Sequence, residues 1–195
     1  GELSNLLDRI YINDGLGVFT DETATRFAGM PLDSARDIEF VDHDADGDLD
    51  VFCVNHAKSP TPGQVSRFLA NLGGLQRGNV GFYQEDTDDR WGQLVSVPLV
   101  DQVYGGNYGP FRNWSADADF ADLDDDGDVD LFFTSYGPGV DGTKPSRLFH
   151  NDGSGVFNEL WPWANTGADV SWHTIDTDLA DFDGDFDLDV FCVNH

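Results

Sequence analysis

The chain has no long hydrophobic run and few basic residues. No stretch of about 18 apolar residues occurs, and no export signal is visible in the first ten residues, so no membrane-inserted segment is expected. Ten Lys and Arg stand against 37 Asp and Glu, which gives a formal net charge of −27. Nucleic acid and anionic membrane surfaces are bound mainly through basic side chains, so neither is an expected partner. Divalent cations are the natural counter-charge.

Cysteine is nearly absent as well. Cys53 and Cys192 lie in identical hexapeptides, VFCVNH at 51–56 and 190–195. Equivalent positions in two repeats usually lie a repeat apart, beyond disulfide reach, so we interpret both as small buried residues. The two cysteines therefore do not indicate whether the protein is in a reducing or an oxidising compartment. The chain begins with Gly1 and not Met, which suggests a processed or partial chain.

Helical periodicity is weak throughout, whereas hydrophobic residues make up 39% of the 195 residues and aromatic residues 13%, enough for a sizeable core. Short runs rich in β-branched and aromatic residues, such as DIEFVD and DVFCV, predict strands. Turn sequences such as Asn-Asp-Gly separate paired runs, which is typical of tight hairpins. The sequence predicts an all-β fold of twelve strands in six hairpins, arranged in four-stranded units.

Two kinds of block alternate three times along the chain. Copies of the first begin DRIYIN, SRFLAN and SRLFHN, at 8–22, 66–74 and 146–160. An aspartate motif follows each copy: DHDADGDLD at 42–50, DLDDDGDVD at 122–130 and DFDGDFDLD at 181–189. We therefore expect one repeat domain over 1–195, with units of approximately 8–64, 65–145 and 146–195 and a half-unit at each end.

The aspartate spacing suits a hard cation that takes six to eight oxygen ligands. Carboxylates at positions 1, 3 and 5 of a tight loop converge on one point, glycine at position 6 allows the turn, and position 7 offers its backbone carbonyl. Aspartate at position 9 closes the shell, and a strand follows. The predicted ligands of three ions are the side chains of Asp42, Asp44, Asp46 and Asp50 with the carbonyl of Asp48; Asp122, Asp124, Asp126 and Asp130 with the carbonyl of Asp128; and Asp181, Asp183, Asp185 and Asp189 with the carbonyl of Asp187.

Calcium is the expected ion. Magnesium usually rejects a cage of four carboxylates, and zinc would want His or Cys at ligand positions, whereas His43 occupies a variable one. A solvated acidic turn that binds no ion is an alternative explanation for one aspartate motif, but it is a poor explanation for three. Asp125, at a variable position, is expected to face solvent. Phe186 replaces the position-6 glycine in the third motif, so this site is expected to be weaker or reshaped.

Aromatic residues outside the repeats have two interpretations. The long segment 86–113 is either a surface loop packed on its own side chains or a ligand surface, and the tryptophans belong either to such a surface or to the core between repeats. The candidates for contacting carbohydrate or a protein partner are Trp91, Tyr104, Tyr108, Trp161 and Trp163. Asn113 begins an Asn-Trp-Ser triplet and is a candidate glycosylation site.

The sequences SRLFHNDGSGVFNE, ADFADLDDDGDVDLFF and DLADFDGDFDLDVFCVNH together resemble the FG-GAP/VCBS repeat family, the calcium-loop repeats of integrin-α-like β-propellers. The resemblance implies a propeller-like array of about three four-stranded blades, with Ca²⁺ in the loop between the first two strands of each blade. It also implies an extracellular or cell-surface setting. Closed propellers have about four to eight blades. The terminal half-blades are therefore expected to pair with each other, with another copy or with a longer parent chain.

No nucleophile, base or phosphate-binding loop forms a recognisable catalytic pattern, so we do not expect an enzyme. The expected function is a calcium-stabilised extracellular structural or adhesion protein, a self-associating subunit of a surface or filamentous assembly. The alternatives are a carbohydrate-binding propeller that binds glycans and the non-catalytic part of a polysaccharide-degrading enzyme.

Overall fold

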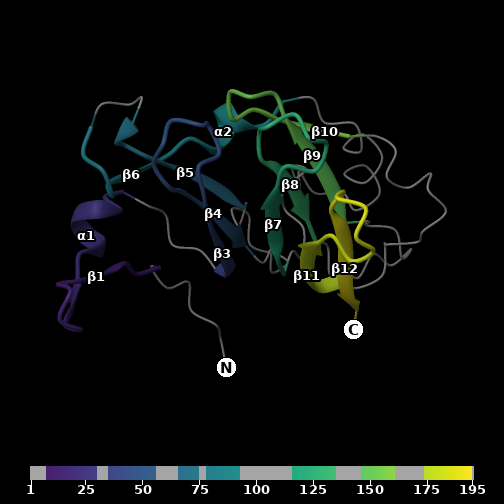
Figure 1. Cartoon of the computed structure of the whole chain (residues 1–195). Helices are drawn as coiled ribbons and strands as arrows, with labels where there is room; N and C mark the ends of the chain where they lie inside the picture. The colour runs from purple at the N-terminus through teal and green to yellow at the C-terminus, as the bar shows by residue number, and fades with distance from the viewer. Residues whose placement is uncertain are drawn as a thin grey trace, which may run out of the picture.

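A computed structural model describes residues 8–29, 35–55, 66–74, 78–92, 116–134, 146–160 and 174–194. These residues form twelve strands and two one-turn helices (Figure 1), so the prediction of twelve strands in six hairpins is confirmed. The strands are β1 (Tyr11–Asn13), β2 (Phe19–Asp21), β3 (Ala35–Val41), β4 (Asp50–Asn55), β5 (Arg67–Asn71), β6 (Tyr83–Glu85), β7 (Ala118–Ala121), β8 (Asp130–Phe133), β9 (Arg147–Asn151), β10 (Phe157–Glu159), β11 (Thr174–Ala180) and β12 (Asp189–Asn194). The helices are α1 (Thr23–Arg26) and α2 (Thr87–Arg90).

Two antiparallel four-stranded sheets form the centre of the array, in the orders β3-β4-β5-β6 and β10-β9-β8-β7. Hairpins β1–β2 and β11–β12 form two-stranded sheets beside them, at opposite ends of the array in Figure 1. The predicted all-β fold of four-stranded blades is confirmed. Within the described ranges the sheets form a propeller-like series and not a closed ring.

The blade boundaries differ from the predicted units 8–64, 65–145 and 146–195. Each four-stranded sheet begins with the hairpin of an aspartate motif and ends with the hairpin that follows it in the chain. The reason is a hydrogen-bonded ladder between these hairpins, in which Val51 lies opposite Leu69 and Leu131 lies opposite Phe149. The copy that precedes each motif in sequence belongs to the previous blade.

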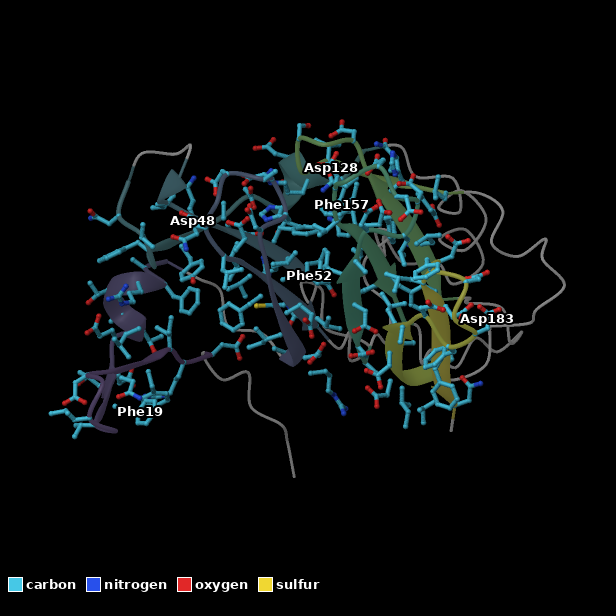
Figure 2. All side chains as sticks on the ribbon, viewed as in Figure 1. Phe19, Asp48, Phe52, Asp128, Phe157 and Asp183 are labelled. Carbon is cyan, nitrogen blue, oxygen red and sulfur yellow. The ribbon has the colours of Figure 1, made fainter. Side chains whose placement is uncertain are left out.

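Aromatic side chains from the two complete blades meet in the main core. Phe52 and Phe68 of the first blade and Phe133, Phe149 and Phe157 of the second are all 0% exposed. The rings of Phe68 and Phe157 stack at 5.1 Å between centroids, and Figure 2 shows Phe52 and Phe157 in this region between the sheets. Each fully buried Phe contributes about 1.5–3 kcal/mol relative to an exposed one, so this interface binds neighbouring blades together.

The two short helices repeat one sequence pattern, Thr-x-x-Arg followed by an aromatic residue. The hydroxyl of Thr87 accepts a hydrogen bond from the backbone N–H of Phe68, and Thr23 does the same for Ile10. The aromatic residues Phe27 and Trp91 then pack against the next blade. In the described part of the chain, no helix has the length and apolar character needed to cross a membrane.

The two cysteines are free and differ in exposure. Cys53 is buried in the second core cluster, with Val51 and Leu69, as expected. Cys192 occupies the equivalent place in β12 but is only half-buried. The difference arises because Cys53 lies within a complete blade, whereas the β11–β12 sheet has two strands among the described residues.

Candidate metal centres

The three aspartate motifs form the turns of three equivalent hairpins. Loop 1 (42–50) joins β3 to β4, loop 2 (122–130) joins β7 to β8 and loop 3 (181–189) joins β11 to β12. Each loop thus lies between the first two strands of its sheet, where the family resemblance places it. Figure 2 shows Asp48 and Asp128 at the upper ends of the two complete blades and Asp183 on the third hairpin.

The first aspartate of each loop organises the turn through backbone hydrogen bonds. In loop 1, Asp42 accepts bonds from the N–H groups of Asp46 at 2.9 Å and Gly47 at 3.0 Å. Loops 2 and 3 repeat both bonds, from Asp126 and Gly127 to Asp122 and from Asp185 and Phe186 to Asp181. These bonds curl the backbone around the first carboxylate in the same way in all three loops.

Carboxylate oxygens converge in every loop. One oxygen from each member of the following groups lies within 4.8 Å of the others: Asp42, Asp44 and Asp46; Asp122, Asp124 and Asp126; Asp181, Asp183 and Asp189. Oxygen ligands lie about 2.4 Å from Ca²⁺, so two ligands of one ion are at most about 4.8 Å apart. The spacing within each group is therefore compatible with a single ion. Asp185, the position-5 residue of loop 3, is not in the third group.

The aspartate at position 9 joins each loop to its sheet. Asp50 is 0% exposed and accepts a 3.2 Å bond from the N–H of His43. Its other oxygen accepts a 2.7 Å bond from the N–H of Asn71, in the next hairpin. Asp130 repeats this arrangement with Leu123 and Asn151. The carboxylate predicted to close the metal shell thus also fixes the following hairpin.

Backbone conformation at positions 4 and 6 is left-handed in all three loops. Position 6 has φ +94° at Gly47, +97° at Gly127 and +81° at Phe186. Position 6 therefore has positive φ in all three loops, and Phe186 adopts it despite its side chain. Position 4 has the same requirement, filled by Ala45, Asp125 and Gly184. Loop 3 therefore exchanges the residue types of the two positions, with glycine at position 4 and a bulky residue at position 6.

The first loop is electrostatically strained without a cation. Burial, and next the neighbouring carboxylates of Asp46 and Asp50, raise the pKa of Asp48 to about 6. Both of its carboxylate oxygens are buried and accept no hydrogen bond from the described residues. Burial also raises the pKa of Asp130, although bonds from Asn151 and Leu123 oppose the shift. A cation held by the converging carboxylates of each loop would oppose both pKa shifts by electrostatic attraction, and this set of oxygen donors fits a hard divalent ion.

Two histidines lie beside the loops, which the sequence interpretation had not anticipated. His43 is 1% exposed, contacts Asp50 through Nδ1 and stacks on Phe68 at 5.2 Å. His150, on β9, places Nδ1 3.0 Å from a carboxylate oxygen of Asp124. The repeats gave no signal for these roles, because position 2 is His in one loop only and His150 follows its loop by twenty residues.

Inter-blade contacts surround loop 1. Arg90 bonds Asp44 at 3.0 Å and the carbonyl of Ser154, on the next blade, at 3.3 Å. The amide of Asn151 donates to the carbonyl of His43 at 2.9 Å. Sequence reasoning missed these residues, although the repeated pattern of Thr-x-x-Arg and an aromatic residue was a usable signal. Loop 1 thus lies at a junction between two blades.

The aromatic candidates have different outcomes. Trp91 is half-buried against the main core, with its ring 5.0 Å from that of Phe68, so it fits the alternative of a core tryptophan and not a sugar-binding surface. The other candidates lie outside the described residues: Tyr104, Tyr108, Trp161, Trp163 and the glycosylation candidate Asn113. Asp125 is exposed, as predicted.

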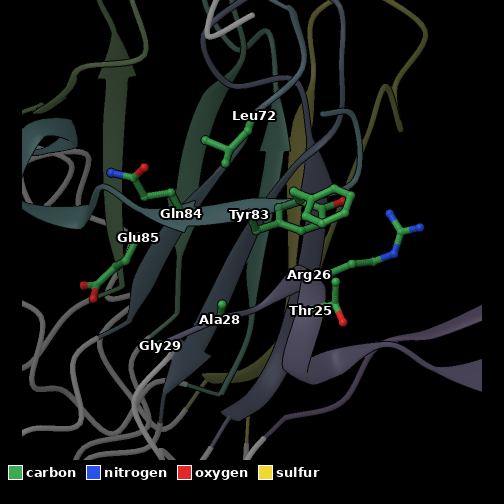
Figure 3. A pocket seen from close by; sticks show the side chains of 9 residues that line it. Thr25, Arg26, Ala28, Gly29, Leu72, Tyr83, Gln84 and Glu85 are labelled. Carbon is green, nitrogen blue, oxygen red and sulfur yellow. The ribbon is translucent and has the colours of Figure 1, made fainter. Parts of the chain in front are cut away.

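A cavity of about 510 Å³ lies between α1 and β6, lined in part by Arg26, Tyr83 and Gln84 (Figure 3). Arg26, the one cation among the described residues that line it, already has bonding partners. Arg26 donates to Glu22 at 2.7 Å and to the carbonyl of Gly81 at 2.9 Å, and lies over the ring of Phe82. The contacts of Arg26 are therefore like those of Arg90, the equivalent residue of α2. We interpret the residues that line this cavity as part of the fold and not as a binding site.

The comparison with known families agrees with this geometry. Residues 122–192, from loop 2 to the end of the third hairpin, match the family model described as FG-GAP-like repeat. The resemblance seen in the sequence is confirmed over this segment. No curated protein matches the chain at a significant level.

Proposed function

We propose, from the FG-GAP-like repeat at residues 122–192, that this chain is a calcium-stabilised structural or adhesion module of an extracellular or cell-surface protein. FG-GAP-like repeats are typically non-catalytic domains of extracellular β-propellers, so a role in holding or presenting surfaces agrees with the match. The observation that carries the calcium assignment is the convergence of carboxylate oxygens in three equivalent loops.

Calcium would neutralise the charge that each loop concentrates. Nine residues of loop 1 contain five aspartates, and Arg90 bonds one of them, Asp44. Ca²⁺ accepts six to eight oxygens in flexible geometry, which suits four carboxylates and one carbonyl better than the strict octahedron of Mg²⁺. In loop 2 the imidazole of His150 lies next to the carboxylate of Asp124. Because imidazole suits Zn²⁺ and carboxylates also suit Mg²⁺, these are the two ions to compare with Ca²⁺.

The ion would stabilise the folded chain and would take no part in a reaction. It would fix the turn between the first two strands of each blade and, through Asp50 and Asp130, the hairpin that follows. An ion that binds only the folded chain stabilises it by about 2.7 kcal/mol per site at 100 times its dissociation constant. A module that is rigid at extracellular calcium and looser without it would suit a surface scaffold.

The test compares two adjacent substitutions with the same charge change. Asp124→Asn removes a predicted ligand of loop 2, and Asp125→Asn changes an exposed neighbour at a variable position. Calorimetric titration of Ca²⁺ should give three sites in the parent chain and in Asp125→Asn. In Asp124→Asn one site should weaken by at least about tenfold, because ligand charge sets affinity.

The same samples give a second readout. Chelator should lower the melting temperature of the parent, and Ca²⁺ should restore it where equal Mg²⁺ does not. An unchanged melting temperature in chelator, or equal binding by the two variants, would contradict the proposal.

A further inference from the structure

One hairpin turn of the second blade contacts two of the metal loops. This turn, residues 151–155, leads from β9 into β10 and is called the bridging turn below. It lies next to α2, which follows the last strand of the first blade (Figure 1). On one side the bridging turn contacts loop 2 of its own blade, and on the other side it contacts loop 1 of the neighbouring blade. The same few residues make both sets of contacts.

On the side of loop 2, the bridging turn is bonded to a predicted metal ligand. The backbone N–H of Asn151 donates to the carboxylate of Asp130 at 2.9 Å, and its amide donates to the carbonyl of Val129 at 3.1 Å. A Cβ atom added at Gly153 would lie 2.7 Å from a carboxylate oxygen of Asp128, so the turn packs closely on the loop. The position of the bridging turn therefore depends on the conformation of loop 2.

On the side of loop 1, the bridging turn contacts the backbone between two predicted ligands. The amide of Asn151 donates a second bond, of 2.9 Å, to the carbonyl of His43 at position 2 of the loop. A Cβ atom added at Gly155 would lie 3.1 Å from the same carbonyl and 2.9 Å from the Cβ of Asp44. A displacement of the turn would therefore move the part of loop 1 that carries its first and second ligands.

Arg90 adds a charged connection between loop 1 and the bridging turn. Its guanidinium donates to the carboxylate of Asp44 at 3.0 Å and to the carbonyl of Ser154 at 3.3 Å. The side chains of Arg90 and Asp44 are only 12% and 8% exposed, so solvent screens this ion pair little. Asp86 also bonds the guanidinium and fixes it on α2. One predicted ligand of loop 1 is thus held in place partly by the turn of the next blade.

We propose that loops 1 and 2 bind Ca²⁺ cooperatively and that the bridging turn couples them. An ion in loop 2 would fix Asp130 and, through its bond, Asn151. The turn would then hold the carbonyl of His43 and the carboxylate of Asp44 in loop 1. The conformational entropy of ordering the turn is then lost once for two ions, which makes the second ion bind more tightly than the first. This inference rests on the proposed calcium binding, and it implies that two neighbouring blades become rigid together over a narrow range of calcium concentration.

Amide NMR of the full chain can follow the two loops separately. The N–H groups of Gly47 in loop 1 and Gly127 in loop 2 each donate a 3.0 Å bond to the first carboxylate of their loop, so their resonances should shift when that loop takes up Ca²⁺. Asp126→Asn removes an exposed predicted ligand of loop 2. Coupling between two sites is typically about 5–150-fold, and the midpoint of two equal sites changes by the square root of this factor. In Asp126→Asn, loop 1 should therefore need about two- to tenfold more Ca²⁺ for half-filling than in the parent.

The direction of this shift separates coupling from a simple effect of charge. An empty loop 2 in Asp126→Asn has one more negative charge than a filled loop 2 in the parent, because one carboxylate and a doubly charged ion are both missing. Electrostatics alone would therefore make loop 1 bind more tightly in this variant. Asp46→Asn, in loop 1, should in turn weaken loop 2, because coupling between binding sites is reciprocal. Asp125→Asn, the exposed neighbour with the same charge change, should leave both midpoints as in the parent.

A glycine substitution tests the route through the bridging turn. Gly155→Ala places a methyl group against loop 1, and in this background Asp126→Asn should no longer change the midpoint of loop 1. Gly17→Ala is the matched control, since Gly17 has the equivalent place in the β1–β2 turn. Both glycines have left-handed backbone, with φ +77° at Gly155 and +88° at Gly17, but no described atom lies within 4 Å of a Cβ atom added at Gly17. The response of loop 1 to Asp126→Asn should therefore persist in the Gly17→Ala background.

The outcomes separate this inference from the proposed calcium binding. If both loops fill in the parent but the midpoint of loop 1 is unchanged or lower in Asp126→Asn, the coupling is wrong and the calcium sites stand. If neither amide responds to Ca²⁺, the calcium sites are wrong and the coupling with them. A loop 1 that still responds to Asp126→Asn in the Gly155→Ala background would contradict the route through the bridging turn.

Discussion

Asp50, at the start of β4, accepts a 2.7 Å hydrogen bond from the backbone N–H of Asn71, at the end of β5. Asp130 and Asn151 repeat this relationship at 2.9 Å in the second blade. A predicted metal ligand therefore also holds two hairpins of one sheet together. Because the same carboxylate serves both purposes, metal binding and blade assembly are expected to be coupled.

Replacement of this carboxylate should destabilise the blade even without metal. Asp50→Asn keeps the shape of the side chain but loses one of its two acceptor oxygens, so a buried N–H of His43 or Asn71 lacks an acceptor. An unsatisfied buried donor costs about 1–3 kcal/mol. Urea unfolding in chelator should show a loss of this size.

Asp125→Asn is the matched control for that measurement. It has the same charge change at an exposed position, where substitutions usually stay within about 0.5 kcal/mol. Equal unfolding free energies of the two variants in chelator would show that Asp50 acts through metal alone.

Asn151 should be more important for stability than Asn13, although the two residues occupy equivalent hairpin turns. Asn151 donates to the carbonyls of His43 and Val129 and accepts bonds from its own turn, while Asn13, among the described residues, accepts bonds from its own turn alone. Asn151→Ala should cost at least about 3 kcal/mol and Asn13→Ala about 1 kcal/mol. Both losses are measured by urea unfolding in chelator. Equal losses would show that the inter-blade bonds contribute little.

The sequence was sufficient to predict what is local and repeated. Alternating apolar residues and Asn-Asp-Gly turns predicted the hairpins, and the aspartate spacing predicted loops whose carboxylates converge. The blade boundaries were not predictable in this way, because two kinds of hairpin alternate along the chain and their periodicity does not say which neighbouring hairpin completes a sheet. The pairing of β4 with β5 depends on contacts such as Asp50 with Asn71, twenty-one residues apart.

Contacts between blades were still less predictable. Arg90 reaches Ser154 over 64 residues, and Asn151 reaches His43 over 108. Periodicity does not identify the partners of such residues, although Arg26 repeats the bond of Arg90 to a carbonyl of the next blade. The position of Trp91 in the core likewise depends on the second blade. Only the repeated Thr-x-x-Arg pattern with its aromatic residue was available as a sequence signal.

Phe186→Gly should stabilise loop 3. Phe186 is 90% exposed and has φ +81°, so its side chain contributes strain and little packing. Left-handed backbone costs a non-glycine residue about 1–2 kcal/mol, while glycine gains about 0.5–1 kcal/mol of entropy in the unfolded chain. The net gain should be up to about 1 kcal/mol by urea unfolding in calcium. Phe186→Ala, which keeps the strain, should resemble the parent; an equal gain from Ala would identify the exposed ring as the cause.

Glu39 on β3 should make stability depend on pH near neutrality. Burial, and next the charges of Asp37, Asp119 and Asp117, raise its pKa to about 7 from an ordinary 4.5. The folded chain therefore holds a proton that the unfolded chain has lost, and this contribution to stability is full below the unfolded value and is lost as pH rises through about 7. Burial raises the pKa of Asp117 to about 6 as well, which adds a fall at lower pH.

Glu39→Gln should therefore be more stable than the parent at pH 8 and should flatten the decline between pH 6 and 8. Unfolding is measured in chelator, because acid would otherwise displace metal from the loops and lower stability in the opposite direction. Asp88→Asn, which removes one charge from an exposed position of α2, should keep the slope of the parent. A slope unchanged by Glu39→Gln would show that Glu39 does not cause the pH dependence between pH 6 and 8.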